Sequence, residues 1–243
     1  MKTANFSSSS SSRMVVKSLN EIKASLGWRV VYAWVGDDPC GDGGLPPWSG
    51  VICTTQGDYR VVTELEVYAV SIVGLFPTAV TNLLDLTRLD LHNNKLTGPL
   101  PPQIGHLKHL KTLWNKLQDV IPPEIGELKQ LTHLDVGNNR LVGTIRELIR
   151  VEGCFPALRN LYLNSNYLTG GIPAQLANLT NLEILYLSYD KMAGIIPASI
   201  AHIPKLTYLA AITFSFSALL GRIQSMKMIL FGKAIGISSM QNH

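Results

Sequence analysis

The feature that most constrains this chain is a frame of leucines closed by asparagine, glycine and proline. Residues 86–101 read L-x-x-L-x-L-x-x-N-x-L-x-G-x-L-P, and residues 158–173 repeat the pattern with isoleucine before the proline. The frame begins again at Leu182, so its step from Leu158 is 24 residues. A period of this length predicts a solenoid, because a single coil cannot bury its own apolar face and must stack on its neighbours.

The spacing within the frame predicts the structure of each coil. With the first leucine as position 1, positions 4 and 6 alternate with polar neighbours, which is typical of a short strand with one buried face. Strands of successive coils would then form a parallel sheet, about 4.8 Å apart. An asparagine at position 9 can satisfy backbone groups that the turn leaves unpaired. This structural role is expected for Asn94, Asn115, Asn139 and Asn166.

Six coils follow this frame, and several depart from it. They start at Val62, Leu86, Leu110, Leu131, Leu158 and Leu182, and a seventh opens at Leu206 before the frame is lost. The fourth coil has Arg146 in place of proline and extra residues in 150–156, away from the strand. The sixth has Asp190 in place of asparagine.

The third coil is three residues short. Leu110 and Leu113 fit the frame, but Trp114–Leu117 follows too early, as if positions 5 to 7 of the strand were missing. Since a solenoid depends on contacts between neighbouring coils, we expect a kink or an irregular strand in 112–116, with Trp114 displaced.

Two cysteine-bearing segments precede the repeats. Residues 34–40 read W-V-G-D-D-P-C and residues 48–53 read W-S-G-V-I-C. Together with the G-x-[IL]-P segments at Gly98, Gly170 and Gly194, they resemble plant extracellular leucine-rich-repeat proteins, from about residue 19 to residue 209. The run Val61–Val70 is similar to members that lack a kinase domain.

The resemblance implies a fold and a class of function. The fold is an α/β, right-handed leucine-rich-repeat horseshoe with a parallel sheet on its concave face and a helical N-terminal cap closed by a Cys40–Cys53 disulfide. The family includes receptor-like kinases, receptor-like proteins and secreted inhibitors of pathogen polygalacturonases. The resemblance therefore implies protein or peptide recognition at the cell surface in signalling or defence, with a receptor kinase as one candidate partner.

The expected organisation has four parts. A Ser-rich disordered N-terminus covers 1–13, the cap 14–61, the repeats 62–206, and a degenerate repeat or irregular apolar tail 207–243. Within the cap, the spacing of Leu19, Ile22 and Leu26 places them on one face of a helix. No signal peptide is visible in 1–13, so retention in the cytoplasm is the alternative to an extracellular location. Membrane association is expected only through 207–243.

Composition and motifs exclude several functions. The net charge of +4 is small and the basic residues are scattered, which argues against a nucleic-acid partner. Gly232-Lys233 lacks the rest of a phosphate-binding loop, and His106 and His109 have no third metal ligand nearby. We therefore expect no enzyme activity, no cofactor and no metal. The alternatives to a receptor-like binding module are an inhibitor of a secreted pathogen enzyme and a truncated scaffold product without a ligand.

The binding face is expected at positions 2, 3, 5, 7 and 8 of the coils, which point out of the sheet. Its first half is acidic and its second half is rich in tyrosine, a side chain that often anchors interfaces. The candidate residues are Glu66, Tyr68, Arg88, Asp90, His92, His133, Asp135, Tyr162, Asn164, Tyr186, Ser188 and Tyr189.

Two further positions carry modification chemistry. Asn178-Leu-Thr is a candidate glycosylation site on the outer side of the coils, away from the strands. Cys154 is expected to be a free or buried thiol.

Overall fold

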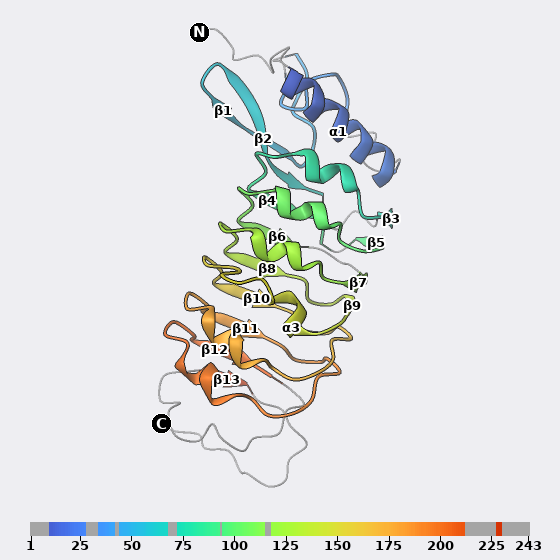
Figure 1. Ribbon diagram of the computed structural model, residues 1–243. Coiled ribbons are helices and arrows are strands. Elements are labelled where there is room, and N and C mark those ends of the chain that lie inside the picture. The colour runs from blue at the N-terminus through green and yellow to red at the C-terminus, as the bar shows by residue number, and fades with distance from the viewer. Residues whose placement is uncertain are drawn as a thin grey trace, which may run out of the picture.

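The computed structural model shows a stack of coils that runs from a helical cap at one end to a strand-bearing coil at the other (Figure 1). It describes residues 10–27, 34–41, 44–67, 72–92, 94–114, 118–211 and 227–229. The expected site residue Tyr68 and the ladder residue Asn115 lie outside the described residues.

The cap consists of a helix and a hairpin. Helix α1 (Ser10–Leu26) buries Leu19, Ile22 and Leu26 and packs against η1 (Thr78–Asn82) of the first coil. It begins inside the serine run, so the expectation of disorder through residue 13 is wrong for residues 10–13. Serine is only a moderate helix former, but the apolar face further along the helix is fixed by packing, and helix growth from it adds one hydrogen bond per residue.

The hairpin links the cap to the repeats. Strands β1 (Val51–Gln56) and β2 (Tyr59–Glu66) pair in an antiparallel manner, and β2 then pairs in parallel with β4 (Arg88–Asp90) of the next coil. Cys40 and Cys53 form a disulfide. Trp34 stacks on Trp48 with ring centroids 5.0 Å apart, and both indole N–H groups donate to backbone carbonyls. The cap thus covers the open end of the first coil.

Each coil then contributes one short strand to the same sheet. After β2 and β4 come β6 (Thr112–Trp114), β8 (His133–Asp135), β10 (Asn160–Tyr162), β11 (Ile184–Tyr186), β12 (Tyr208–Ala210) and β13 (Lys227–Ile229), all parallel. These strands occupy frame positions 3 to 5, and the leucine at position 4 is buried in every coil from Leu65 to Leu209. Strand β13 shows that part of the tail continues the sheet.

The return side of the coils carries shorter elements. Pairs β3–β5 (Val73–Leu75, Lys95–Thr97) and β7–β9 (Gln118–Val120, Arg140–Val142) form two small parallel sheets. The 3-10 helices follow the prolines: η2 (Pro102–His106), η3 (Pro123–Glu127), η4 (Ala174–Asn178) and η5 (Ala198–His202).

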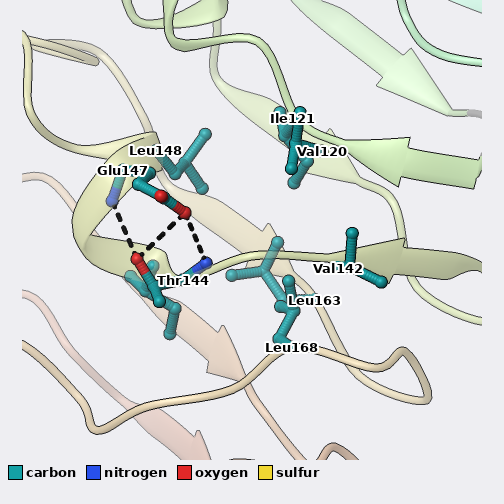
Figure 2. A pocket seen from close by; sticks show the side chains of 9 residues that line it. Val120, Ile121, Val142, Thr144, Glu147, Leu148, Leu163 and Leu168 are labelled. Carbon is teal, nitrogen blue, oxygen red and sulfur yellow. Dashed lines mark hydrogen bonds between the residues drawn. The ribbon is translucent and has the colours of Figure 1, made fainter.

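The fourth coil replaces the proline-started 3-10 helix by an α-helical turn, α3 (Ile145–Leu148). Thr144 accepts a hydrogen bond from the Glu147 amide, and the Glu147 carboxylate accepts one from the Thr144 amide, which is a capping box (Figure 2). Apolar side chains of three neighbouring coils surround it and leave a cavity of only about 10 Å³. The coil without its proline is therefore still well packed.

The expected kink in the third coil is wrong for the residues described. Leu113 and Trp114 lie in register with Leu89 and Asp90 on one side and with Leu134 and Asp135 on the other. Trp114 therefore occupies position 5, and the missing residues fall after the strand, between Trp114 and Gln118. The pairing survives because Leu110 and Leu113 still fill the core and both are fully buried.

Position 9 of the coils binds backbone groups. The Asn94 side chain accepts from the amide of Ile72 and donates to the carbonyls of Val67 and Leu91. Asn166 repeats this pattern with Leu141, Val136 and Leu163. Asn139 donates to the carbonyls of Val136 and Gly137 in its own coil.

Candidate functional site

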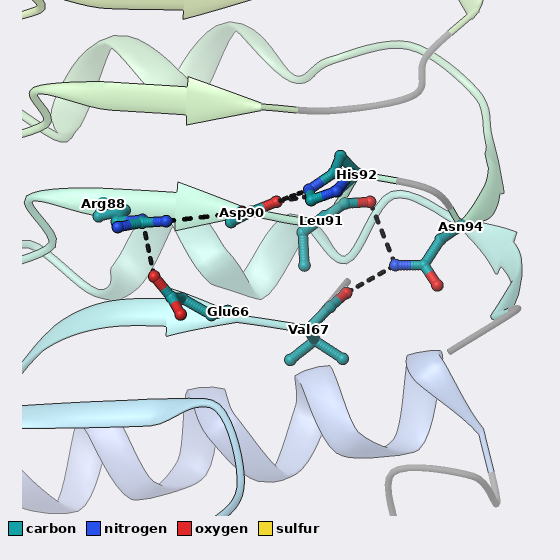
Figure 3. Close-up of polar contacts among 7 residues, drawn as sticks. All are labelled: Glu66, Val67, Arg88, Asp90, Leu91, His92 and Asn94. Atoms are coloured by element: carbon teal, nitrogen blue, oxygen red, sulfur yellow. Dashed lines mark hydrogen bonds and ion pairs between the residues drawn. The ribbon is translucent and has the colours of Figure 1, made fainter. Parts of the chain in front are cut away.

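The outward side of the long sheet is called the strand face here, and its first half carries charges that are paired with one another. Arg88 lies 2.7 Å from the Glu66 carboxylate and 3.9 Å from that of Asp90 (Figure 3). Asp90 also contacts the His92 ring and accepts a hydrogen bond from the His92 amide. The carboxylates of Glu66 and Asp90 in the first half are therefore paired with basic side chains rather than free for a ligand.

Three residues expected to be exposed on this face are buried. Asp90 is 2% exposed, Asn164 8% and Ser188 0%. Asp90 contacts its neighbours Arg88 and His92. Asn164 and Ser188 are at position 7, beyond the three-residue strand, where the chain turns back; the Asn164 amide fills the space left by Gly137, which has no side chain. These three residues are not available to a partner.

The middle of the face carries His133 and Asp135, both half-buried on β8. The Asp135 carboxylate accepts a hydrogen bond from the Gly137 amide at 2.9 Å. Burial raises the pKa of this carboxyl above its ordinary value, against the opposing effects of that hydrogen bond and of His92.

The second half of the face is a ladder of tyrosines. The rings of Tyr162 and Tyr186, and those of Tyr186 and Tyr208, meet edge to face with centroids 6.3 Å apart in both cases. All three are half-buried, and burial raises the pKa of Tyr162 and Tyr186. Within the described part of the chain, none of the three hydroxyls has a hydrogen-bond partner. The ladder thus offers aromatic surface and free donors together.

Tyr208 was not among the residues predicted for the binding face, because its coil loses the frame directly after Leu209. It is at position 3, opposite Ile184, and its ring leans toward the position-5 ring of Tyr186. An aromatic residue at an outward strand position of the next coil was the signal that could have found it.

Tyr189 has an unusual backbone. Tyr189 is 61% exposed and has a φ of 64°. Asn138 and Ser165, at position 8 of the two preceding coils, also have positive φ values, of 55° and 58°. Asparagine tolerates this left-handed region, whereas it is uncommon for a bulky residue. Tyr189 therefore keeps the turn conformation of this position at a conformational cost, with its ring exposed in the same coil as Tyr186.

Comparison with known proteins identifies leucine-rich repeats in three segments of the chain. The family described as "Leucine rich repeat" matches residues 156–211, and a second leucine-rich-repeat family matches 85–107 and 130–151. A putative leucine-rich repeat receptor-like serine/threonine-protein kinase of Arabidopsis thaliana is 35% identical over 162 residues. The matched segments are leucine-rich repeats, and the chain is similar in sequence to plant leucine-rich-repeat proteins.

The relatives are longer than this leucine-rich-repeat chain. The match covers 55% of the chain and 16% of that kinase. A polygalacturonase inhibitor of Pyrus communis is 35% identical over 99 residues, which cover 40% of the chain and 28% of the inhibitor. The chain thus spans less than a third of the length of either relative.

Solved structures agree with the fold. A plant ice-binding protein superposes with a TM-score of 0.72 at 28% identity, over 84% of this chain and 64% of that one. The plant peptide hormone receptor RGFR1 in complex with RGF2 gives a TM-score of 0.54 at 31% identity, over 60% of this chain and 23% of that one.

The remaining candidates lie off the strand face. Asn178 is exposed at the end of η4, on the proline side of the coils. The Cys154 thiol is not in a disulfide, lies 3.7 Å from the carbonyl of Ile149, and has its pKa raised by burial. No group of three or more metal-ligating side chains occurs in the ranges that the structure covers. None of the helices in those ranges has the length and apolarity of a membrane span.

Proposed function

We propose that this protein is a non-enzymatic recognition module that binds a peptide or a protein segment on the second half of its strand face. The observation that carries the proposal is the edge-to-face ladder of Tyr162, Tyr186 and Tyr208, whose hydroxyls have no hydrogen-bond partner among the described residues. Tyrosine buries a large area at a small entropic cost and is enriched at binding hot spots.

The relatives support a peptide as the ligand. RGFR1 was solved with the peptide RGF2, and PEPR1, which is 30% identical with a TM-score of 0.55, was solved with AtPEP1. We infer that the site lies outside the cell, as in receptor ectodomains. We also propose Asn178 as a glycosylation site that leaves the strand face open. A receptor kinase is the proposed partner in signalling.

The experiment uses the whole chain and a panel of plant peptide hormones, with binding measured by calorimetry. Tyr162→Ala with Tyr186→Ala is expected to weaken binding by at least about 30-fold, because truncating a hot-spot residue costs about 2 kcal/mol or more. Tyr59→Ala, which truncates an exposed tyrosine of the cap hairpin, is the control and should bind normally. Unchanged affinity in the double variant would reject the ladder as the site.

A second candidate is an inhibitor of polygalacturonase, which the similarity to the Pyrus communis inhibitor favours. It predicts that the chain slows pectin hydrolysis by a fungal polygalacturonase in a saturable manner. Absence of inhibition at micromolar concentrations, together with peptide binding, would leave the first proposal alone.

A further inference from the structure

Strands β5, β7 and β9 follow one another along one edge of the stack (Figure 1). Residues in and beside them line a hollow. It has a volume of about 470 Å³, within the range of small-ligand sites. Its lining surface is about half polar and comes from four successive coils: Lys95, Leu96, Thr97, Gln118, Asn138, Asn139, Arg140 and Tyr167.

The charges in the hollow have one sign. Lys95 and Arg140 occupy position 10 of the second and fourth coils, and both are exposed. Neither has an ion-pair or hydrogen-bond partner for its side chain in the described part of the chain. Lys191, at position 10 of the sixth coil, lies 4.8 Å above the ring of Tyr167 and adds a third cation at the rim. None of the described residues that line the hollow carries a carboxylate.

The other lining groups suit a ligand with both polar and flat surfaces. Gln118 and Asn138 can donate and accept hydrogen bonds, and Tyr167 is 44% exposed. Two cations without a partner among the described residues, together with amides and an aromatic ring, are a set that binds a carboxylate and the peptide groups beside it, since Arg forms paired hydrogen bonds with carboxylates.

One residue that lines the hollow, Asn138, is also at a coil position of the expected binding face. Asn138 follows β8 at position 8, the position that Tyr189 holds two coils further along. A chain that crosses the tyrosine ladder toward the N-terminus therefore meets the hollow at Asn138. Its occupant then belongs to the same ligand, and this step rests on the proposed function.

We propose that the hollow between the second and fourth coils is a subsite for an acidic segment of the peptide ligand, with Lys95 and Arg140 as the groups that bind its carboxylates. The coils on either side of the third coil supply the charge of the site.

The test measures binding of acetyl-tetraglutamate to the whole chain by calorimetry in low salt, with acetyl-tetraglutamine as the neutral probe. The acidic probe is expected to bind at least tenfold more tightly and to weaken as salt rises. Lys95→Gln with Arg140→Gln should reduce its affinity about tenfold, since a hydrogen bond to a charged group contributes roughly that much. Lys17→Gln with Lys108→Gln makes the same change in charge elsewhere and should have no effect.

Two results overturn the proposal. Equal binding of the acidic and neutral probes, or equal binding by the Lys95/Arg140 variant and wild type, removes the subsite. Binding of trigalacturonate in the absence of tetraglutamate binding assigns the hollow to an acidic sugar instead. Tyr162→Ala with Tyr186→Ala should leave tetraglutamate binding intact, so failure of the ladder and failure of the hollow are told apart. Matching thermal melts of all variants show that the fold is retained.

Discussion

Asp190 takes the place of an asparagine in the sixth coil and changes what that position can bind. Its Oδ1 accepts from the amides of Asn166 and Leu168, as the Asn166 oxygen accepts from the Leu141 amide. Its Oδ2 is buried without a partner, at the place where asparagine supplies an N–H donor. Burial raises the pKa of Asp190 to about 7, against the lowering effect of the two hydrogen bonds. A proton on Oδ2 restores the missing donor.

The raised pKa makes stability depend on pH. The folded state holds the Asp190 proton more tightly than the unfolded state, whose carboxyl has a pKa near 3.8. The stabilising contribution is therefore complete below about pH 4 and is lost as pH rises to about 7. Asp190→Asn should increase the free energy of unfolding at pH 8 by about 1 to 2 kcal/mol, a figure reduced because the side chain is only partly buried. At pH 4 the change should be small.

Urea unfolding of both proteins at pH 4, 6 and 8 checks this. Asp58→Asn, in the exposed turn of the cap hairpin, is the matched control and should be neutral at all three values. A stability difference between Asp190→Asn and wild type that does not grow from pH 4 to pH 8 would contradict the assignment.

At the scale of the element, the third coil shows how a short repeat closes. Asp119 has a φ of 74°, in the left-handed region that glycine adopts at position 13 in Gly98, Gly143, Gly170 and Gly194. Its carboxylate accepts a hydrogen bond from the Val120 amide, which is one reason that aspartate tolerates this region. The residue still carries a conformational cost that glycine does not.

Asp119→Gly is expected to stabilise the protein by about 0.5 to 1 kcal/mol, because it removes the strain of a non-glycine residue at positive φ. Thermal and urea melts of the variant and wild type measure the effect. Asp119→Ala, which keeps the strain and removes the carboxylate, should be less stable than wild type. If the glycine variant also loses stability, the hydrogen bond to Val120 outweighs the backbone strain.

The sequence predicted the coils better than the face they present. The leucines at positions 1 and 4 are buried in each full coil because their spacing alone places them inside. Which outward positions stay exposed depends on the neighbouring coil, as Asn164 against Gly137 shows, and no spacing rule contains that information. In the third coil, the prediction assigned Trp114 to a position beyond the strand and therefore put the missing residues inside the strand. The local pattern fits both alignments, and only the pairing with Asp90 and Asp135 decides between them.

At the scale of the whole molecule, the cap disulfide holds the start of the sheet. It joins the loop before the hairpin to β1, across 13 residues, and Arg60 adds an ion pair with Asp38 at 2.7 Å and a hydrogen bond to the Cys40 carbonyl. Cys40→Ser with Cys53→Ser should lower the free energy of unfolding by about 3 kcal/mol, from the entropy of the open loop. The melting temperature should fall by about 6 to 12 °C.

Circular dichroism melts with and without reductant check this on the wild type and the double variant. Reductant should lower the wild-type midpoint to that of the variant and leave the variant unchanged. Cys154→Ser is the control, since its thiol is outside the disulfide. If the midpoint of the wild-type melt is the same with and without reductant, the stability of the cap does not depend on this disulfide.

The third and fourth coils also show how a repeat array can acquire new features. One is 21 residues long and the next 27, from the starts at Leu110, Leu131 and Leu158, yet β6, β8 and β10 stay in register. Insertions and deletions that spare the strand are therefore absorbed within one coil. Evolution can therefore shorten one coil and lengthen the next, and the strands of the sheet keep their register.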